Sequence, residues 1–374
     1  MFVDIYSESL NRRGEELCGD VVRAARQADR SIVVLSSGFD GGVKACILAT
    51  LTAEIIVTLF RMDIPIEDVV ATVIGTLPVS KTHGAAYSTF TVLEVHHENH
   101  AFRVLNYDNP ETFFFRNGAP FRIDARPELV LGKRILMREG TLQDGDFLGL
   151  ASGGLVNAGR EELAAHLSDL IRRRPGSARY VVHETINRFR ASCEGQPEDD
   201  ATFAGVYFRP HRSLMVFTGP PLNRDEDDAR ARQLLAFQGA KVVCGGTTGG
   251  IVASYLGCAV KTERSTELSS LPPIGVLPEV DLVTEGILTM ASALDCMKNA
   301  GGDLWRLPGE RNGAVLLANE LLRADSILFL LGQAINPHYQ NPLLPRSISI
   351  RRNLVEQIAE FLRGLNKEVE IEYC

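Results

Sequence analysis

Four short polar segments in the first part of the chain have the composition of turns at strand ends, and several of them carry aspartate. They are CGD at 18–20, SSGFDGG at 36–42, ASGG at 151–154 and EDDATF at 198–203. Carboxylates from distant strand ends can hold a pair of divalent cations, because Mg²⁺ and Mn²⁺ prefer hard oxygen ligands. When one carboxylate bridges two such cations, a shared water becomes a nucleophile near neutral pH. The segments therefore indicate a metal cleft of the kind that hydrolyses phosphomonoesters.

The elements that would position these segments follow a pattern typical of layered folds. The apolar run SIVVLSS at 31–37 predicts a strand, and residues 43–60 and 64–78 have the spacing of two helices. Strand patterns continue from 85 to 154, and two helical segments and a last strand complete the region by residue 210. Paired helices, a run of strands, paired helices and a strand predict an α+β layered sandwich.

In their order and spacing, the four segments resemble the PPM-type metal-dependent serine/threonine phosphatases, in particular the SpoIIE-like bacterial branch. That family shows in succession a Gly-Asp, a Ser-Asp-Gly turn leading into a helix, a second Ser-Asp-Gly after a Gly-Asp strand, and a terminal Asp-Asp-x-Thr. The matching stretches here are LCGD (17–20), LSSGFDGGVKA (35–45), DGDFLGLASGGLVNAG (144–159) and DDATF (199–203). The resemblance covers roughly residues 1–210 and implies an αββα sandwich with the metals at one edge of the central sheets.

Two positions depart from the family pattern. The first Ser-Asp-Gly corresponds to Ser36, Ser37 and Gly38, so that Ser37 stands where the resemblance places the bridging aspartate. The second corresponds to Ser152-Gly153-Gly154, so that Gly153 stands at another metal aspartate. Loss of a residue that only supports a metal ligand lowers metal affinity or activity about 10- to 100-fold. Loss of two ligands, one of them the bridge, should cost more.

The acids that remain define the candidate site. The resemblance implies that Asp20 and Asp199 hold metal and carry catalysis, with help from Asp200. Asp40 lies three residues after Ser37 and could supply a replacement carboxylate, although Asp beside Gly41 is also common turn chemistry. Asp20 could equally cap a helix or a turn, and the acids at 198–200 could form a solvated loop.

Two functions remain open for this domain. One is a SpoIIE-like regulatory protein, a pseudophosphatase in which phosphoserine and phosphothreonine hydrolysis is weak or lost. The other is an active Mn²⁺- or Mg²⁺-dependent protein serine/threonine phosphatase that uses the retained aspartates. The cofactor is accordingly Mn²⁺ or Mg²⁺ in an active enzyme and none in an inactive one. In both cases the expected partner is a phosphoprotein or regulatory protein of a bacterial signalling system.

From about Arg212 strands and helices alternate as βαβα units, which predicts a smaller, doubly wound α/β domain. The expected domains are residues 1–211 and 212–374. One strand runs into Gly245, Gly246, Thr247, Thr248, Gly249 and Gly250 before a helix. Backbone N–H groups of such a turn can surround an anion, and the segment predicts a small anionic ligand. It lacks the spacing of a P-loop or a dinucleotide fingerprint, and a tight βα turn is the alternative.

Composition limits the partners and the compartment. A formal net charge of −8 and the lack of a basic stripe argue against nucleic-acid binding. The longest apolar stretch, residues 46–60, contains Glu54 and is expected to be too short to cross a membrane. Seven scattered cysteines without a CxxC pair indicate reduced thiols in a cytoplasmic protein. HHENH at 96–100 is expected to be the exposed tip of a hairpin, with a metal site as the less favoured alternative.

Overall fold

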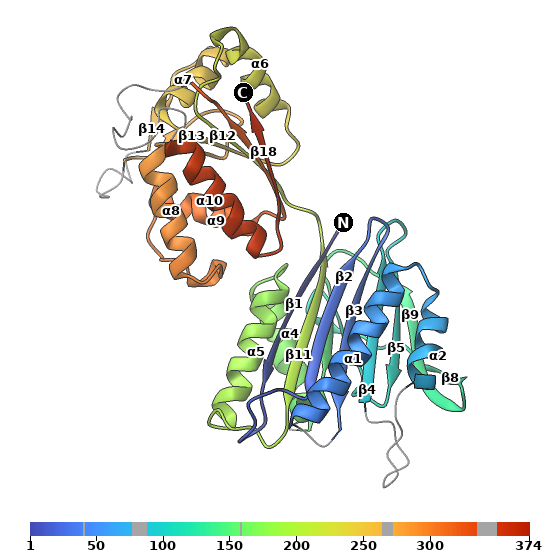
Figure 1. The fold of residues 1–374 in the computed structure, drawn as a ribbon. Coiled ribbons are helices and arrows are strands. Elements are labelled where there is room, and N and C mark those ends of the chain that lie inside the picture. Colours follow the sequence, from blue (N-terminus) through green and yellow to red (C-terminus); the bar gives the residue numbers. More distant parts are fainter. Residues whose placement is uncertain (40–41, 77–87, 158, 264–271, 335–349) are drawn as a thin grey trace. The chain divides into compact units, whose positions relative to one another are not determined.

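The computed structural model describes residues 1–39, 42–76, 88–157, 159–263, 272–334 and 350–374 (Figure 1). The chain forms two compact units, Met1–Pro210 and His211–Cys374, which are called here the N-terminal unit and the C-terminal unit. The sequence places the boundary between residues 211 and 212, next to the point where the units meet along the chain. Each unit has its own sheets and its own core.

The N-terminal unit contains two antiparallel sheets. The β1 sheet has the strand order β1 (Phe2–Leu10), β11 (Ala201–Arg209), β10 (Asp146–Ala151), β6 (Phe113–Arg116), β7 (Ala119–Pro120). The β2 sheet has the order β2 (Asp20–Arg26), β3 (Arg30–Gly38), β4 (Ser88–His96), β5 (Ala101–Tyr107), β9 (Lys133–Thr141), β8 (Arg126–Val130). The HHENH segment makes the turn between β4 and β5, as the sequence predicts.

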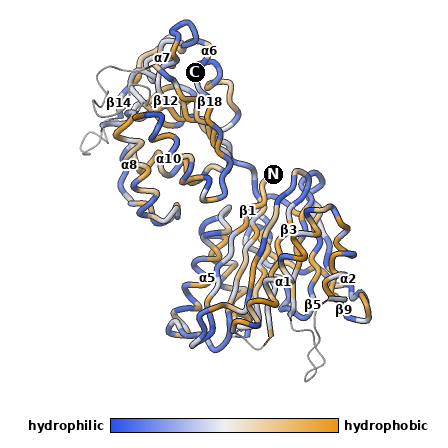
Figure 2. The backbone as a smooth tube through the Cα atoms, viewed as in Figure 1, coloured by the Kyte–Doolittle hydropathy of each residue, from blue (hydrophilic) through white to orange (hydrophobic). Residues whose placement is uncertain are grey.

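Each sheet of this unit has one face against the other sheet and one face against a pair of helices. Helices α1 (Gly42–Arg61) and α2 (Ile66–Thr76) cover the β2 sheet, and α4 (Arg160–Arg173) and α5 (Ala178–Ser192) cover the β1 sheet (Figure 1). Alternation along β3 accounts for the layers, because Ile32 packs with the helices and Val33 packs between the sheets. Both faces of β3 are therefore apolar, which Figure 2 shows along the strand. The predicted αββα sandwich is confirmed.

Helix α1 corrects one expectation from the sequence. It runs for 20 residues and, by length and composition alone, could cross a membrane, whereas the apolar stretch was expected to be too short. The core helix of a globular domain meets the same criteria. Here Ala49, Ala53 and Ile56 are completely buried against the β2 sheet, whereas Val43 and Ile47 are exposed. The small residues on the inner face allow the helix to approach the sheet closely.

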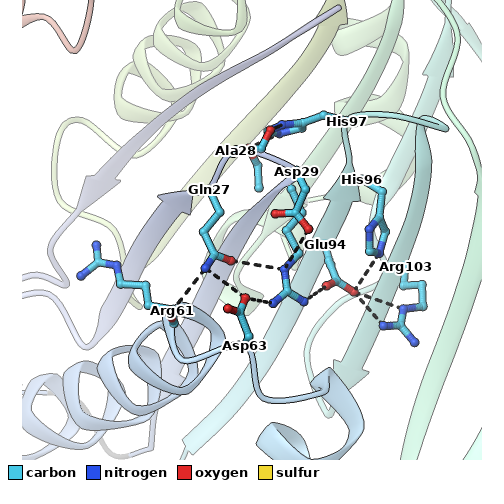
Figure 3. A network of polar contacts seen from close by, with 11 residues as sticks. Gln27, Ala28, Asp29, Arg61, Asp63, Glu94, His96, His97 and Arg103 are labelled. Atoms are coloured by element: carbon cyan, nitrogen blue, oxygen red, sulfur yellow. Dashed lines mark hydrogen bonds and ion pairs between the residues drawn. The ribbon is translucent and has the colours of Figure 1, made fainter.

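A buried ion-pair network joins the α1–α2 corner to the β2 sheet (Figure 3). Glu94 of β4 is completely buried and accepts hydrogen bonds from Arg30 (3.2 Å) and Arg103 (2.8 Å). Arg30 also binds Asp63, which follows α1, and Arg103 binds Glu67 in the first turn of α2. A buried carboxylate needs such partners, because an unpaired buried charge is costly. The network therefore fixes the helix pair on the sheet.

The C-terminal unit has one sheet with helices on both faces. Its strand order is β14 (Lys261–Thr262), β15 (Gly275–Val276), β16 (Leu282–Thr284), β13 (Ala240–Cys244), β12 (Ser213–Thr218), β17 (Ser326–Leu331), β18 (Glu368–Tyr373). From β16 to β18 all neighbours are parallel. One face packs on α6 (Asp227–Ala236) and α7 (Gly246–Tyr255), and the other on α8 (Ile287–Asn299), α9 (Gly313–Arg323) and α10 (Ile350–Gly364). This is the doubly wound arrangement that the alternation predicts.

The buried network yields a prediction about stability. Glu94→Gln leaves two largely buried guanidinium groups with weaker partners and should lower the free energy of unfolding of the N-terminal unit by about 2–4 kcal/mol. The matched control is Glu54→Gln, which breaks an exposed pair with Arg23 and should cost less than about 1 kcal/mol. Urea unfolding followed by circular dichroism reports the change. Trp305, the single tryptophan, lies in the C-terminal unit, and its fluorescence transition should stay unchanged. Equal effects of the two variants would contradict the role given to Glu94.

Candidate functional site

Strand alternation brings the four polar segments together at one edge of the N-terminal sandwich. In β3, Val33 and Leu35 point between the two sheets, and Ser37 continues that series. In β11, Ala204 and Val206 point into the same space, and Thr202 precedes them on the same face. Asp20 is the first residue of β2 and lies two residues before Val22, on the same face of the strand. Ser152 lies just after β10 and two residues after Leu150, again on the same face. The space between the sheets at this edge is called here the cleft.

Asp20 and Ser37 face each other directly across β2 and β3. The neighbouring pair, Gly19 and Gly38, is hydrogen-bonded, since the N–H of Gly38 donates to the carbonyl of Gly19 at 2.8 Å. Asp20 and Ser37 are therefore a non-hydrogen-bonded pair, in which the two side chains lie closer together. Asp20 is buried and Ser37 is half-buried, and the buried atoms Asp20 Oδ2 and Ser37 Oγ have no hydrogen-bond partner within 3.5 Å among the described residues. One carboxylate oxygen and one hydroxyl in the cleft are thus left without a close partner.

The two acids before β11 are used differently from Asp20. Asp200 is buried, and its two carboxylate oxygens accept the backbone N–H groups of Arg12 and Gly19, each at 2.9 Å. Asp199 is exposed, and its Oδ1 accepts the N–H of Asp200 at 2.9 Å. The Asp200 carboxylate therefore holds the chain segment between β1 and β2 next to the start of β11. This structural use accounts for its burial.

Ser152 and Thr202 also line the cleft, although the sequence analysis did not select them. Ser152 Oγ accepts the N–H of Thr202 (2.9 Å), and Thr202 Oγ1 donates to Ser9 Oγ (2.8 Å). Thr202 could have been recognised from the sequence, because residues two apart in a strand share a face and Thr202 follows Asp200 by two. Gly153 begins the short helix α3 (Gly153–Val156), and a Cβ there would meet only Asn157 Nδ2, at 3.8 Å. The position has room for a carboxylate that the sequence does not supply.

Glycine at 38 and 154 has a steric reason. A Cβ on Gly38, the last residue of β3, would lie 2.2 Å from the carbonyl oxygen of Ala45 in α1. A Cβ on Gly154 would lie 2.3 Å from the carbonyl oxygen of Asp200. These glycines allow the backbone segments to approach at the cleft. Asp40, the candidate replacement carboxylate, lies outside the described residues.

Burial controls the charge of the cleft. It raises the pKa of Asp20 from 3.8 to about 6; the hydroxyls of Ser152, Ser37 and Thr202 lower this pKa in part, and the carboxylate of Asp200 raises it further. Burial, followed by the charge of Asp20, raises the pKa of the neighbouring Cys18 thiol to about 12. In this surrounding the thiol is therefore protonated near neutral pH.

The described side chains of the cleft do not by themselves supply the ligands for a pair of divalent cations. Such a site needs several free carboxylates, one of them bridging. Among the described residues, Asp20 is the acid with a buried carboxylate oxygen that lacks a partner at the cleft, because Asp200 is occupied by backbone N–H groups and Ser37 and Gly153 carry no charge. In the described part of the chain, no group of three or more His, Cys, Asp or Glu side chains could hold a metal ion.

The glycine-rich segment of the C-terminal unit lies at the carboxyl end of β13, but most of it is helical. Gly245 is the N-cap of α7, and Gly246 to Gly250 form its first turn and the start of its second. Gly246 and Thr247 are exposed, whereas Thr248 is buried and its Oγ1 accepts the N–H of Gly219 (2.9 Å). Gly249 and Gly250 therefore do not belong to the loop where an anion would meet the helix terminus.

The raised pKa of Asp20 predicts how stability depends on pH. Its carboxyl binds a proton more tightly in the folded state than in the unfolded state, so its contribution to stability falls as pH rises from about 4 to about 6. Asp20→Asn removes this cost. Relative to wild type, the variant should become more stable across that interval, by up to about 3 kcal/mol above it.

Urea unfolding at several pH values, followed by circular dichroism, tests this difference. Asp199→Asn is the matched control, because that carboxylate is exposed and carries no burial cost. A difference between Asp20→Asn and wild type that stays constant from pH 4 to pH 7 would show that the buried carboxylate does not titrate as described.

A comparison of the sequence with family models identifies a family for the N-terminal unit. Residues 27–209 match the sequence model of the family described as Stage II sporulation protein E (SpoIIE). A search of curated protein sequences finds no match. Among solved structures, the chain resembles the PP2C phosphatase domain with a fragment of the regulatory domain of SpoIIE from Bacillus subtilis, at 16% identity and a TM-score of 0.49, covering 56% of this chain and 64% of that chain.

Two further solved structures resemble this chain at similarly low identity. The RsbU and RsbW domains of a Mycobacterium tuberculosis protein match at 17% identity and a TM-score of 0.49, covering 62% of this chain and 67% of that chain. A serine/threonine phosphatase of Staphylococcus aureus matches at 11% identity and a TM-score of 0.43, covering 56% and 96%. Values this low do not indicate a function. The family match and the αββα sandwich with its edge cleft lead to one assignment: the N-terminal unit belongs to the SpoIIE family of PPM-type (PP2C) phosphatase domains.

Proposed function

We propose that the protein is a bacterial cytoplasmic regulator whose SpoIIE domain has weak or lost phosphoserine and phosphothreonine phosphatase activity. One observation supports the proposal: the positions that the resemblance matches to metal aspartates lie at one edge of the sandwich, and of the described acids there Asp20 is the one with a buried carboxylate oxygen that lacks a partner. A hydroxyl at 37 and a hydrogen at 153 cannot hold two cations close together. The domain then acts by binding a phosphoprotein or a regulatory protein.

The alternative is an active enzyme that uses Mn²⁺ or Mg²⁺. The unpartnered Oδ2 of Asp20 favours it, because a single cation beside Asp20 would supply the missing partner. Asp199 would be the second ligand, and its exposed carboxylate could turn toward such a cation. Metal binding and hydrolysis by the wild-type protein separate the two functions.

Restoring the acids tests the proposal directly. Wild type should show no Mn²⁺ binding tighter than millimolar in isothermal titration and no hydrolysis of p-nitrophenyl phosphate. Ser37→Asp combined with Gly153→Asp should strengthen Mn²⁺ binding by at least 10- to 100-fold, because it returns two ligands to the cleft. Hydrolysis should appear in the same variant.

The matched control adds two negative charges away from the cleft. Thr58→Asp with Asn99→Asp places them at exposed positions of α1 and of the turn between β4 and β5, at the other end of β3 from Ser37, where they should change neither binding nor hydrolysis. Wild-type hydrolysis that needs Mn²⁺ and is lost in Asp20→Asn would instead establish the active enzyme. A restored variant that is folded and binds Mn²⁺ without hydrolysing would show that the correspondence of Ser37 and Gly153 to the metal aspartates is wrong.

A further inference from the structure

The C-terminal unit has a topological switch point between β12 and β17. The family match ends at residue 209, before this unit begins. The chain enters the sheet at β12, adds β13 and β16 on one side, and returns to β17 and β18 on the other. After β12 it continues into α6 on one face, and after β17 the next helix among the described residues is α10 on the opposite face. In open parallel sheets, ligands bind outside the carboxyl ends of the two strands where the order reverses.

The backbone at this switch point is built from closely approaching glycines. Gly219 follows β12 with a φ of +84°, and Gly332 follows β17. A Cβ on Gly332 would lie 2.2 Å from the carbonyl oxygens of Gly219 and Pro220, so no other residue fits there. The two strand ends are held together by the N–H of Gly332, which donates to the carbonyl of Thr218 at 3.0 Å.

A positive charge lies against these glycines. Arg351 belongs to the first turn of α10, and its Nη1 would be 2.5 Å from a Cβ on Gly219. A side chain at position 219 would therefore displace the guanidinium from the switch point. Glu285, an acid at the same edge of the sheet, turns to α8 instead, where its Oε2 accepts the N–H of Leu288 at 3.2 Å.

The first turn of α7 reaches the same glycine from the other face. Thr248 Oγ1 accepts the N–H of Gly219 at 2.9 Å, which fixes the start of the helix beside the end of β12. The N-cap Gly245 offers no side-chain oxygen, and Gly246 and Thr247 are exposed. Amide N–H groups in the first turn of a helix favour an anion, and Thr248 of that turn and Arg351 both reach Gly219.

A buried hydroxyl without a partner is the independent observation that indicates a ligand. Thr218, the last residue of β12, is completely buried, and its Oγ1 has no hydrogen-bond partner among the described residues. Leu214 and Val216 place its side chain on the face that α10 covers, which is the face of Arg351. An unpaired buried hydroxyl is unfavourable. Valine has nearly the same shape and would fill the space without that cost. A hydroxyl at this position is therefore expected to form a hydrogen bond with a bound molecule.

We propose that the switch point binds a small molecule through a phosphate group, held by Arg351, by the first amides of α7 and by the hydroxyl of Thr218. This moves the anion site predicted at residues 245–250 to the switch point and reduces that segment to its first residues. The site is independent of the cleft in the N-terminal unit and does not depend on phosphatase activity there.

Isothermal titration of the full chain with sodium pyrophosphate, in EDTA and at constant ionic strength, tests the proposal. Arg351→Gln should weaken binding about tenfold or more, because it removes a charged hydrogen-bond donor. Arg352→Gln is the matched control, since Arg352 is the adjacent residue and pairs with Glu356 at 2.8 Å. Arg352→Gln and Asp20→Asn should both bind as wild type. Arg351→Lys keeps the charge and should recover part of the affinity.

Thr218→Val should weaken pyrophosphate binding without lowering the midpoint of the Trp305 fluorescence transition, because no hydrogen bond within the protein is lost. The same transition shows whether each arginine variant has a folded C-terminal unit. No binding by wild type, equal losses in Arg351→Gln and Arg352→Gln, or loss in Asp20→Asn would overturn the proposal. Unchanged binding in Thr218→Val would also overturn it, because that hydroxyl is the observation that indicates a ligand.

Discussion

The buried carboxylate of Asp20 is the constraint on which the cleft depends. It lies between two apolar sheets, where an isolated negative charge is expensive unless a cation, a proton or several hydrogen-bond donors balance it. The surrounding side chains are hydroxyls and a protonated thiol, and the adjacent Asp200 is already occupied by backbone N–H groups. These surroundings make the Asp20 carboxyl easier to protonate than in water, which its raised pKa of about 6 expresses. In our proposal this is what remains of a site made for two cations.

The sandwich itself does not depend on acids at positions 37 and 153. Its layers are held by apolar residues that alternate along the strands, and the α1–α2 corner is fixed by Glu94 at the other end of β3. The Arg30–His96 pair lies seven residues along β3 from Ser37, which is roughly 20 Å. Chemistry at the cleft can therefore be lost while the fold is retained, which is why fold alone does not establish activity. The C-terminal unit adds a second candidate site at a place where strand order, rather than a motif, brings the residues together.

The strongest patterns in the sequence predicted elements well. SIVVLSS, the helix from residue 43 and the βαβα series after Arg212 have long apolar periods, and the structure forms β3, α1 and the doubly wound sheet there. The sequence analysis missed β1, whose residues FVDIYSESL mix apolar and polar side chains because the strand lies at the edge of its sheet. It also missed β16, which has only three residues. The glycine-rich segment was read as a loop, although tertiary contacts of Thr248 with β12 allow most of it to join α7.

By itself, the sequence determined the fold class, the family resemblance and the two positions, Ser37 and Gly153, where that resemblance expects an acid, because these depend on periodicity and on the order of short segments along the chain. Only the tertiary structure decided what each remaining acid does. Asp200 accepts two backbone N–H groups and Asp20 has an oxygen without a partner, a difference that no spacing in the sequence encodes. The closeness of Arg351 to Gly219 is also visible only in the tertiary structure, because the two residues are far apart along the chain. Hydrogen bonds and burial arise between segments that are distant in sequence, and they set the charge and the bonding capacity of each site.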